Sequence, residues 1–595
     1  MRISRSILIV AASYLAIVLA LWLPFNLRGG LPYETGFIYT SEISKWWNGF
    51  LHGADHMRIY AAIFYQVAYL MGSLTGFAGS FVPFQIVYAA LWWARGFLVF
   101  LIGRRLAPGY DLFWYLAGAL ALIHSSDETT AWAGMLNAAY TLWMPLAFYM
   151  LVLAFQQADR SRAAIALVLA VFFEHLSLWS YEGQLPILIV APLLPLAMYR
   201  RPSNSRLVIA AAWYAVPIIY LAATLRRYAQ PGTHSYQQSI LRKTWSLSSI
   251  LSDWWFNISA SLRFWAWPGP QQFHAGAHDW MLPAACAVVV FLAGTLLLAW
   301  SDSWIPQRRA LGTWMLAGLI LVAISFPAYL ILDSARTLWR TQILSSFGAA
   351  LVLSAAIGIC ASYVPKRWLQ ISAMALLGAA VVSYGSYSTL KKAAYHRWLW
   401  DRHRAAMAQV LDAAPRLKPG TLVILTGVPK DADPFSGDNM WFDMALRLAY
   451  PGTAVAGVYF YRDGAEAPGA GLAISPAGDW RLRGDQLLAK GDVDALLVFE
   501  YHEQNVLSVA RRLPGVLHID ENAARSYHPE ARVESGSPSQ RAVRRYAASI
   551  PADYLPVTNG SANATYAPRM FVCVAFVSPS CADAQNTTNW RPLTS

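Results

Sequence analysis

The sequence has little charge and lacks the short motifs of several enzyme classes. Charged residues are 13% of the 595 residues, against about a quarter in an average soluble protein, and 56% are hydrophobic. It contains no GxxxxGK[ST] loop, no GxSxG turn and no spaced Cys/His set. These absences argue against a nucleotide-driven pump, a serine hydrolase and a zinc site. No cofactor or metal is therefore assigned from the sequence.

Cysteine is also scarce, with four in the whole chain. Cys286 and Cys360 fall inside apolar runs, where we expect the thiols to pack as small hydrophobic groups. Cys573 and Cys581 lie close together near the C-terminus, and they could form a disulfide if that region is outside the cytoplasm. The sequence leaves this pairing open.

Long apolar runs are abundant, and each can cross about 30 Å of hydrocarbon. The first run follows Arg2 and Arg5 and has no small-residue cleavage site after it, so we predict a retained span and not a signal peptide. An α-helical polytopic membrane protein is the predicted class. About eleven spans are predicted, at 6–25, 82–102, 111–125, 138–157, 163–180, 184–199, 206–224, 281–300, 311–330, 344–363 and 369–388.

Basic residues in the connecting segments orient these spans. With eleven spans, the arginines and lysines at the following places fall on one side: Arg2 and Arg5, Arg104 and Arg105, Arg160 and Arg162, Arg200, Arg201 and Arg206, Arg308 and Arg309, and Lys366 and Arg367. Because cytoplasmic loops are enriched in these residues, we predict a bacterial inner membrane protein with a cytoplasmic N-terminus and a periplasmic C-terminal domain. The same pattern explains the net charge of +13 without a nucleic-acid partner and leaves membrane lipids as partners.

Three segments are predicted on the outer side of the membrane, at about 26–81, 124–137 and 225–280. Within the first, a span at 59–79 would move every later loop to the opposite side of the membrane, so we predict an interfacial or re-entrant helix there. A second interfacial helix is predicted at 41–53. The third carries the cations Arg226, Arg227, Arg242, Lys243 and Arg263. These either reflect the tolerance of long loops for basic residues or meet an anionic headgroup or phosphate.

From about residue 391 the composition becomes that of a soluble domain. Residues 391–413 predict a polar helix, and the short apolar runs at 421–426 and 495–499 indicate strands of an α/β fold. We therefore predict a transmembrane domain over 1–390 and a periplasmic α/β domain with a polar tail over 391–595.

Carboxylates occur in the segments predicted outside. Glu34 and Asp55 lie in the first segment, Asp127 and Glu128 in the second, and Glu182 at the outer end of the fifth span. Acids held near hydrocarbon are costly, which favours a functional role. A carboxylate is also the group needed to take a proton from a hydroxyl that attacks a sugar carbon.

Cations suited to phosphate follow the ninth predicted span. Arg336 and Arg340 are four residues apart, so on a helix they share one face. Two guanidinium groups on one face suit a phosphate. The alternatives are that both side chains extend to the interface and that Asp333 pairs with Arg336.

The order of these features resembles the GT-C fold of polyprenyl-phosphate-sugar-dependent glycosyltransferases, and locally the bacterial relatives of O-mannosyltransferases with transmembrane and tetratricopeptide segments. In that family the second outer loop reads roughly His-Pro-x-x-x-Glu-Ala-x-Ala-Trp. Here the segment from His124 to Trp132 is similar, with Glu128 one place earlier and no proline. Arg58-Ile59 looks like the family's Arg-Pro, and Ser180-Tyr-Glu182 looks like its Ser-Lys-Glu.

The likeness covers about residues 1–200 and extends by architecture to about 390. Tyr33-Glu34-Thr35 stands where the family has two acids, and the C-terminal domain has no tetratricopeptide pattern. The resemblance implies an inverting glycosyltransferase of cell-envelope glycan biosynthesis, with a polyprenyl-phosphate sugar as donor and a periplasmic or lipid-linked glycan as acceptor. We predict Glu34 or Asp55 as base, Asp127 and Glu128 as positioning acids, Arg58, Arg336 and Arg340 as phosphate contacts, and His124, Trp132 and Glu182 as substrate-binding residues.

Two other functions fit the same composition. A transporter or flippase of a lipid-linked or anionic substrate would use Arg95 and Glu174-His175 within the spans, although no internal repeat of the transporter kind is visible. A non-catalytic envelope assembly protein would use residues 391–595 as a docking module.

Overall fold

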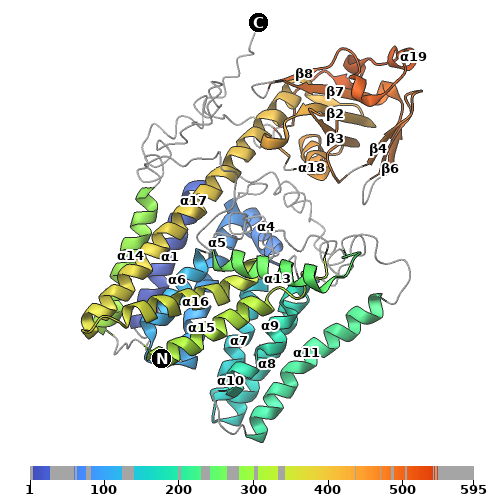
Figure 1. Cartoon of the computed structure of the whole chain (residues 1–595). Coiled ribbons are helices and arrows are strands. Elements are labelled where there is room, and N and C mark those ends of the chain that lie inside the picture. The colour runs from blue at the N-terminus through green and yellow to red at the C-terminus, as the bar shows by residue number, and fades with distance from the viewer. Residues whose placement is uncertain are drawn as a thin grey trace.

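The computed structural model describes residues 5–26, 59–60, 63–75, 82–123, 140–197, 203–228, 241–263, 280–300, 306–332, 342–435, 437–469, 471–483, 488–502, 506–539, 542 and 546. Within these residues, helices form a bundle over the first two thirds of the chain, and a small sheet domain follows at the far end of the last long helix (Figure 1).

The described bundle helices stand at every predicted span. They are α1 (Arg5–Asn26), α4 (Ile63–Thr75), α5 (Val82–Leu106), α6 (Asp111–Leu122), α7 (Tyr140–Gln156), α8 (Arg160–Leu178), α9 (Leu185–Val190), α10 (Leu193–Ala197), α11 (Asn204–Tyr228), α13 (Leu247–Leu262), α14 (Met281–Trp300), α15 (Arg308–Ile324), α16 (Gln342–Ala361) and α17 (Arg367–Ala413). The predicted sixth span is broken into α9 and α10.

Among the described residues, six helices are long and apolar enough to cross a membrane: α1, α5, α8, α11, α16 and α17. Shorter apolar helices occupy 111–122, 142–156, 182–197 and 281–297. The chain therefore has the helices of a membrane protein, while the count of eleven spans and their orientation stay predictions.

Two of the described bundle helices occur outside the predicted spans. α4 has 13 residues, about 20 Å of helix, and lies in the segment 59–79, where an interfacial or re-entrant helix is predicted. α13 has 16 residues and lies in the segment 225–280, where no helix was predicted.

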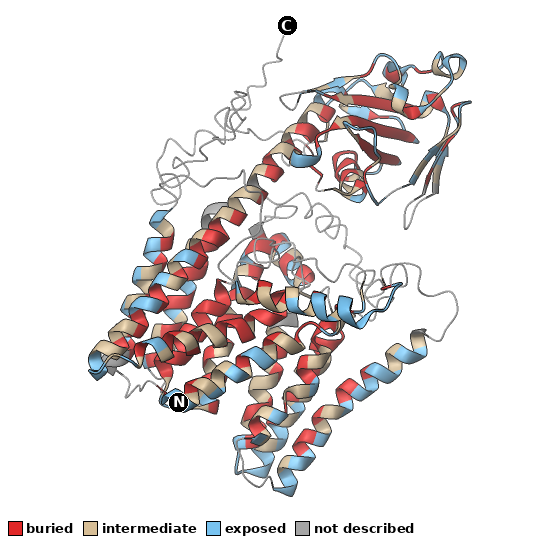
Figure 2. Cartoon of the chain, viewed as in Figure 1, coloured by how far each residue is buried: buried red, intermediate tan, exposed pale blue. Residues whose placement is uncertain are grey.

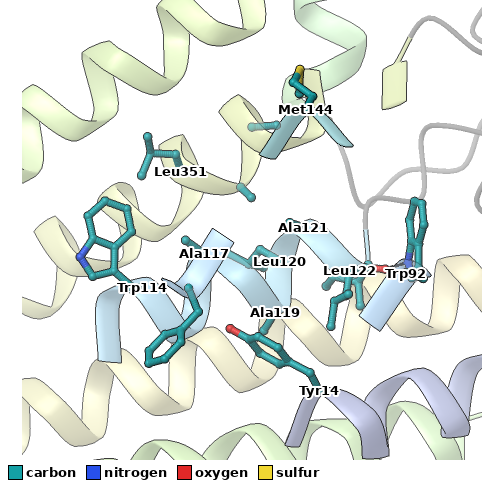
Figure 3. Close-up of a cluster of buried hydrophobic side chains, with 14 of the residues drawn as sticks. Tyr14, Trp92, Trp114, Ala117, Ala119, Leu120, Ala121, Leu122, Met144 and Leu351 are labelled. Atoms are coloured by element: carbon teal, nitrogen blue, oxygen red, sulfur yellow. Dashed lines mark hydrogen bonds between the residues drawn. The ribbon is translucent and has the colours of Figure 1, made fainter. Parts of the chain in front are cut away.

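α6 lies at the centre of the bundle. All 12 of its residues are buried, against α5, α16, α14 and α1 among others. Figure 3 shows Tyr14 of α1 and Trp92 of α5 beside the α6 residues Ala119 and Leu122. Gly96 and Gly118 permit this contact, because a Cβ at Gly96 would lie 2.7 Å from the Leu122 side chain. Small residues of this kind let helices in a membrane approach closely.

α15 and α16 form a second close pair. A Cβ at Gly348 would lie 2.5 Å from the carbonyl oxygen of Gly318, and one at Gly318 would lie 2.8 Å from the carbonyl oxygen of Gly348. The two backbones are therefore in direct contact, so neither position has room for a side chain.

The cysteines behave differently from one another. Cys286 of α14 is buried, as predicted, but Cys360 of α16 is exposed, so the prediction that its thiol packs was wrong. The reason is that Cys360 lies on the outward side of α16, next to the end of the helix. Cys573 and Cys581 lie outside the described residues.

The last long helix continues without interruption into the sheet domain. α17 has 47 residues, about 70 Å, and contains both the last apolar run and the predicted polar helix at 391–413. Several polar residues of its second half are buried, including Lys392, His396 and His403. The polar half of α17 is thus packed against protein along one side.

The C-terminal sheet is mostly parallel, as an α/β fold requires. Its order is β3-β2-β7-β8, in which β2 (Thr421–Val428), β3 (Val455–Tyr461) and β7 (Leu496–Tyr501) are parallel and β8 (Leu507–Val509) is antiparallel. The strands predicted at 421–426 and 495–499 are confirmed. Val423 and Leu425 pack on one face with α17 and α18 (Asn439–Ala449), and Leu422 and Ile424 pack on the other.

Smaller elements complete this domain. β4 (Gly471–Ile474), β5 (Trp480–Arg483) and β6 (Leu488–Gly491) form an antiparallel sheet, and β1 (Arg416–Leu417) pairs with β9 (Val533–Glu534). α19 (Glu521–Ala524) follows. Figure 2 shows that the central strands are buried while the rim of the domain is exposed.

Candidate functional site

Most of the residues proposed from the sequence fall outside the described part of the chain. Only Glu182 is described. The others are Glu34, Asp55, Arg58, His124, Asp127, Glu128, Trp132, Arg336 and Arg340. The geometry of the site therefore has to be built from the residues that flank these segments.

Glu182 lies in a tightly held turn after α8. It opens the short helix η5 (Glu182–Gln184) and is half-buried. The Ser180 hydroxyl donates to a carbonyl one turn back at 2.6 Å, and the Gln184 amide donates to the Tyr181 carbonyl at 3.0 Å. A Cβ at Gly183 would lie 2.7 Å from the hydroxyl of Tyr329, which follows α15. The backbone that carries Glu182 is thus fixed by contacts on both sides.

The residues that follow Arg58 contact the residues that precede Glu182. The backbone N–H of Tyr60 donates to the carbonyl of Trp179 at 3.3 Å. The Tyr60 hydroxyl lies 3.1 Å from Nε2 of His175, and the two rings meet edge to face. Trp179 in turn packs against His175 with ring centroids 4.3 Å apart. Two of the predicted motifs therefore have flanks in direct contact.

The end of α6, just before His124 in the sequence, lies beside α5. The indole N–H of Trp92 donates to the carbonyl of Leu122, the last residue of α6, at 2.7 Å. Trp22, near the end of α1, packs edge-on against Trp92 with ring centroids 6.1 Å apart. The C-terminal ends of α1 and α6, the helices that precede Glu34 and His124 in the sequence, therefore both contact Trp92.

Arg95 lies one turn after Trp92 and is fully buried. Its guanidinium carbon lies 4.4 Å from the ring centroids of both Trp92 and Phe347. Nη2 donates to the carbonyl of Ile343 at 2.9 Å and to the Ser346 hydroxyl. Two ring faces and two acceptors offset part of the cost of a cation inside the bundle.

Arg95 also connects the site to α16. Ile343 is the second residue of that helix, and α16 begins directly after the segment of Arg336 and Arg340. The flanks of the second acidic segment and of the arginine pair are therefore linked through α5.

A buried polar network that the sequence analysis did not find joins α13 to α16. The Gln342 amide donates to Oδ1 of Asn257 at 3.3 Å, and the hydroxyls of Ser261 and Ser345 are 2.7 Å apart. Asp253, Asn257 and Ser261 recur every four residues, which places them on one face of a helix. That spacing was the signal in the sequence.

Arg242, one of the cations of the third outer segment, is not available to a ligand. Its guanidinium forms a buried ion pair with Asp253, and Nη1 donates to the Ser249 hydroxyl at 2.9 Å. Its backbone N–H donates to the carbonyl of Ile331 at 2.9 Å. Arg242 therefore fastens this segment to α13 and to the residues that follow α15, and the expectation that it meets an anionic headgroup or phosphate is not supported.

Glu174 is the most unusual acid among the described residues. It lies in α8 and is fully buried, and neither of its carboxylate oxygens has a hydrogen-bond partner among those residues. The neighbouring His175 is half-buried and contacts Tyr60. A buried carboxyl without such partners is energetically costly.

A second carboxylate cluster lies in the sheet domain. Asp433 accepts hydrogen bonds from the backbone N–H groups of Phe435 and Gly437, and from the hydroxyls of Tyr459 and Tyr461 at 2.8 and 3.0 Å. Burial raises the pKa of Asp433, and these bonds offset part of the rise. Burial and the nearby carboxylate raise the pKa of Tyr461 to about 12. Because every oxygen is already bonded, the cluster holds the loop after β2 against β3.

The described residues contain no group of three or more His, Cys, Asp or Glu side chains that could hold a metal ion. A search against protein-family models finds no match for this chain, and a search of curated proteins finds no relative. The site is therefore interpreted from its own chemistry.

Proposed function

We propose that the protein is an inverting glycosyltransferase of the GT-C type, which transfers a sugar from a polyprenyl-phosphate donor to a periplasmic or lipid-linked glycan. The observation that supports this most directly is the contact of Tyr60 with Trp179 and His175. It joins the flank of Arg58 to the flank of Glu182, two motifs that lie far apart in the sequence. A shared pocket requires such neighbours.

A second contact supports the same pocket. Trp92 bonds the end of α6 and packs against the end of α1, and Arg95 on the same helix bonds the start of α16. The segments of Glu34, Glu128 and Arg336 each begin or end at one of these helices. Acids and cations from separate segments can then meet at one sugar phosphate.

In the proposed reaction the acceptor hydroxyl attacks the anomeric carbon of the donor as the bond from that carbon to the phosphate oxygen breaks. Glu34 or Asp55 takes the hydroxyl proton, and polyprenyl phosphate leaves with the bonding electrons. Arg58, Arg336 and Arg340 compensate the charge of the departing phosphate. Asp127 and Glu128 hold the sugar or the acceptor in line. Attack from the side opposite the phosphate inverts the anomeric centre.

The test is sugar transfer from a polyprenyl-phosphate donor by the purified protein. We expect Glu128→Gln, and one of Glu34→Gln and Asp55→Asn, to lower the rate by about 10²-fold or more, because a carboxylate that handles the proton or the sugar is lost. Glu521→Gln is the matched control, since Glu521 is exposed in the sheet domain. If all three acid variants keep the rate of the control, the assignment of the site is wrong.

A transport function makes a different prediction in the same preparation. A flippase would move a labelled lipid across proteoliposomes without forming a covalent product. The contacts of Arg95 with two rings and with α16 hold its side chain inside the bundle, which disfavours its use along an open path. Lipid movement without sugar transfer would replace the proposal with this alternative.

A further inference from the structure

α13 has its polar side turned into the protein and an apolar side turned outward. Asp253, Asn257 and Ser261 are buried, whereas Leu247 and Trp255 are 73% and 70% exposed. Leu251 lies between these two on the helix and is also exposed. In a protein surrounded by water this arrangement would leave a row of large apolar side chains in solvent. The helix therefore faces something other than water along this side.

The remaining side of α13 is small and polar. Ser248 and Ser252 are exposed, and they lie next to the apolar row on the helix. α13 thus has three distinct sides: one packed on the bundle, one apolar and one lined with serines. A helix lying in a membrane interface needs this division, with one side toward hydrocarbon and one toward water.

Its contacts place α13 across the ends of two bundle helices. The indole N–H of Trp254 donates to the carbonyl of Ala323, the next-to-last residue of α15, at 2.8 Å. On the other side, Asn257 and Ser261 bond Gln342, the first residue of α16. Figure 1 shows α13 on the side of the bundle that faces the sheet domain.

The apolar row continues the outer surface of α15. Ile320 is exposed and lies one turn before Ala323, and Leu316 is exposed one turn further back. Trp254 donates to Ala323, so α13 is held at the end of α15. Both helices carry exposed apolar side chains.

Within residues 241–263, the charged side chains exposed beside the apolar row are positive. Lys243 precedes α13 and Arg263 follows it, and both are exposed. The only acid between residues 241 and 263 is Asp253, which is buried and paired with Arg242. Exposed cations at both ends of an apolar helix side suit anionic lipid headgroups, which attract them near a membrane surface.

We propose that α13 lies in the membrane interface, with Leu247, Leu251 and Trp255 in the lipid and with Lys243 and Arg263 against anionic headgroups. The partner is the bilayer itself, and a protein partner is the alternative that the experiment separates from it. The proposal does not depend on the chemistry of the site. α13 also forms the buried polar network with the start of α16. Its position in the lipid would therefore help to fix the position of α16.

The test uses the full chain in nanodiscs, with its four cysteines replaced by alanine. A single cysteine is introduced at Trp255 or at Ser252 and labelled with an environment-sensitive fluorophore. Quenching is measured with doxyl-labelled phosphatidylcholine and with doxyl-labelled phosphatidylglycerol. Leu251→Cys provides a second lipid-side position if the label at 255 lowers the yield of folded protein.

We expect the labels at 255 and 251 to show blue-shifted emission and several-fold stronger quenching than the label at 252. Quenching at 255 should be stronger with phosphatidylglycerol, and the double variant Lys243→Gln/Arg263→Gln should lose that preference. Equal, weak quenching at all three positions would overturn the proposal and favour a protein partner. Equal quenching by the two lipids in the labelled protein that retains Lys243 and Arg263 would overturn the role of these cations.

Discussion

The hydroxyl of Tyr60 lies 3.1 Å from Nε2 of His175, a residue 115 positions further along the chain. Tyr60 follows Arg58 by two residues, and His175 lies in α8 just before the turn of Glu182. The contact thus fixes the residues that follow Arg58 against the C-terminal end of α8. If the site is shared between these segments, its geometry depends on this pair.

Replacing Tyr60 by phenylalanine should lower sugar transfer about fivefold, because one hydrogen bond of about 1 kcal/mol is lost while the ring remains. The yield of folded protein should not change. Tyr149→Phe is the control, since Tyr149 is a half-buried tyrosine of α7 away from this contact. Initial rates of sugar transfer measure the effect. Equal rates for both variants would mean that the hydrogen bond of Tyr60 does not contribute to the site.

Arg95→Lys should destabilise the bundle by about 1–3 kcal/mol, because lysine cannot keep both ring faces and both acceptors. Arg309→Lys is the control, since Arg309 is exposed at the start of α15. Thermal unfolding in detergent measures the difference. A midpoint for Arg95→Lys equal to that of the control would mean that the stacked guanidinium contributes little.

Gly348→Ala should separate α15 from α16 and lower the thermal midpoint, because its Cβ would lie 2.5 Å from a carbonyl oxygen of the facing helix. Gly312→Ala is a matched control on α15, since no atom lies within 4 Å of its Cβ. That control should be neutral or slightly stabilising, as alanine is the better helix former. The same effect from both variants would contradict the close packing.

The raised pKa of Asp433 predicts how the sheet domain responds to acid. Its folded pKa lies above the unfolded value of about 3.9, so ionisation costs more in the folded state. The contribution of Asp433 to stability is therefore greatest below the unfolded pKa and falls as the pH rises through the window between the two values. Asp433→Asn should remove this dependence.

Hydrogen exchange of β2 and β3 in the full chain, corrected for intrinsic rates, measures this opening free energy at each pH. Asp463→Asn is the control, because Asp463 is exposed and its pKa is lowered by Lys430, which gives the opposite sign. If the pH dependence of the opening free energy is lost in the Asp463 variant and kept in the Asp433 variant, Asp433 is not its source.

The apolar pattern predicted the positions of the bundle helices well, because length and composition alone determine where a helix can cross lipid. The strands at 421–426 and 495–499 were also found, since short apolar runs between amphipathic stretches are typical of a parallel sheet. The predicted third span is short because α6 ends at Leu122 inside the bundle, where the indole N–H of Trp92 donates to the Leu122 carbonyl.

α13 was missed for a physical reason. Its polar side is buried and its apolar side is exposed. Sequence reasoning expects the opposite arrangement, in which the apolar side of a helix packs on the protein. The role of Arg95 could not be predicted either, because Ser346, its acceptor, lies 251 residues away. The acids of the candidate site other than Glu182 lie outside the described residues, and the roles of all of them stay predictions.

The uninterrupted course of α17 has a mechanical consequence. The helix contains no proline, a common cause of sharp kinks, and runs as one element from the bundle into the sheet domain. Because the displacement at the far end of a straight helix grows with its length, we expect a small tilt of the apolar half to move the sheet domain by a larger distance.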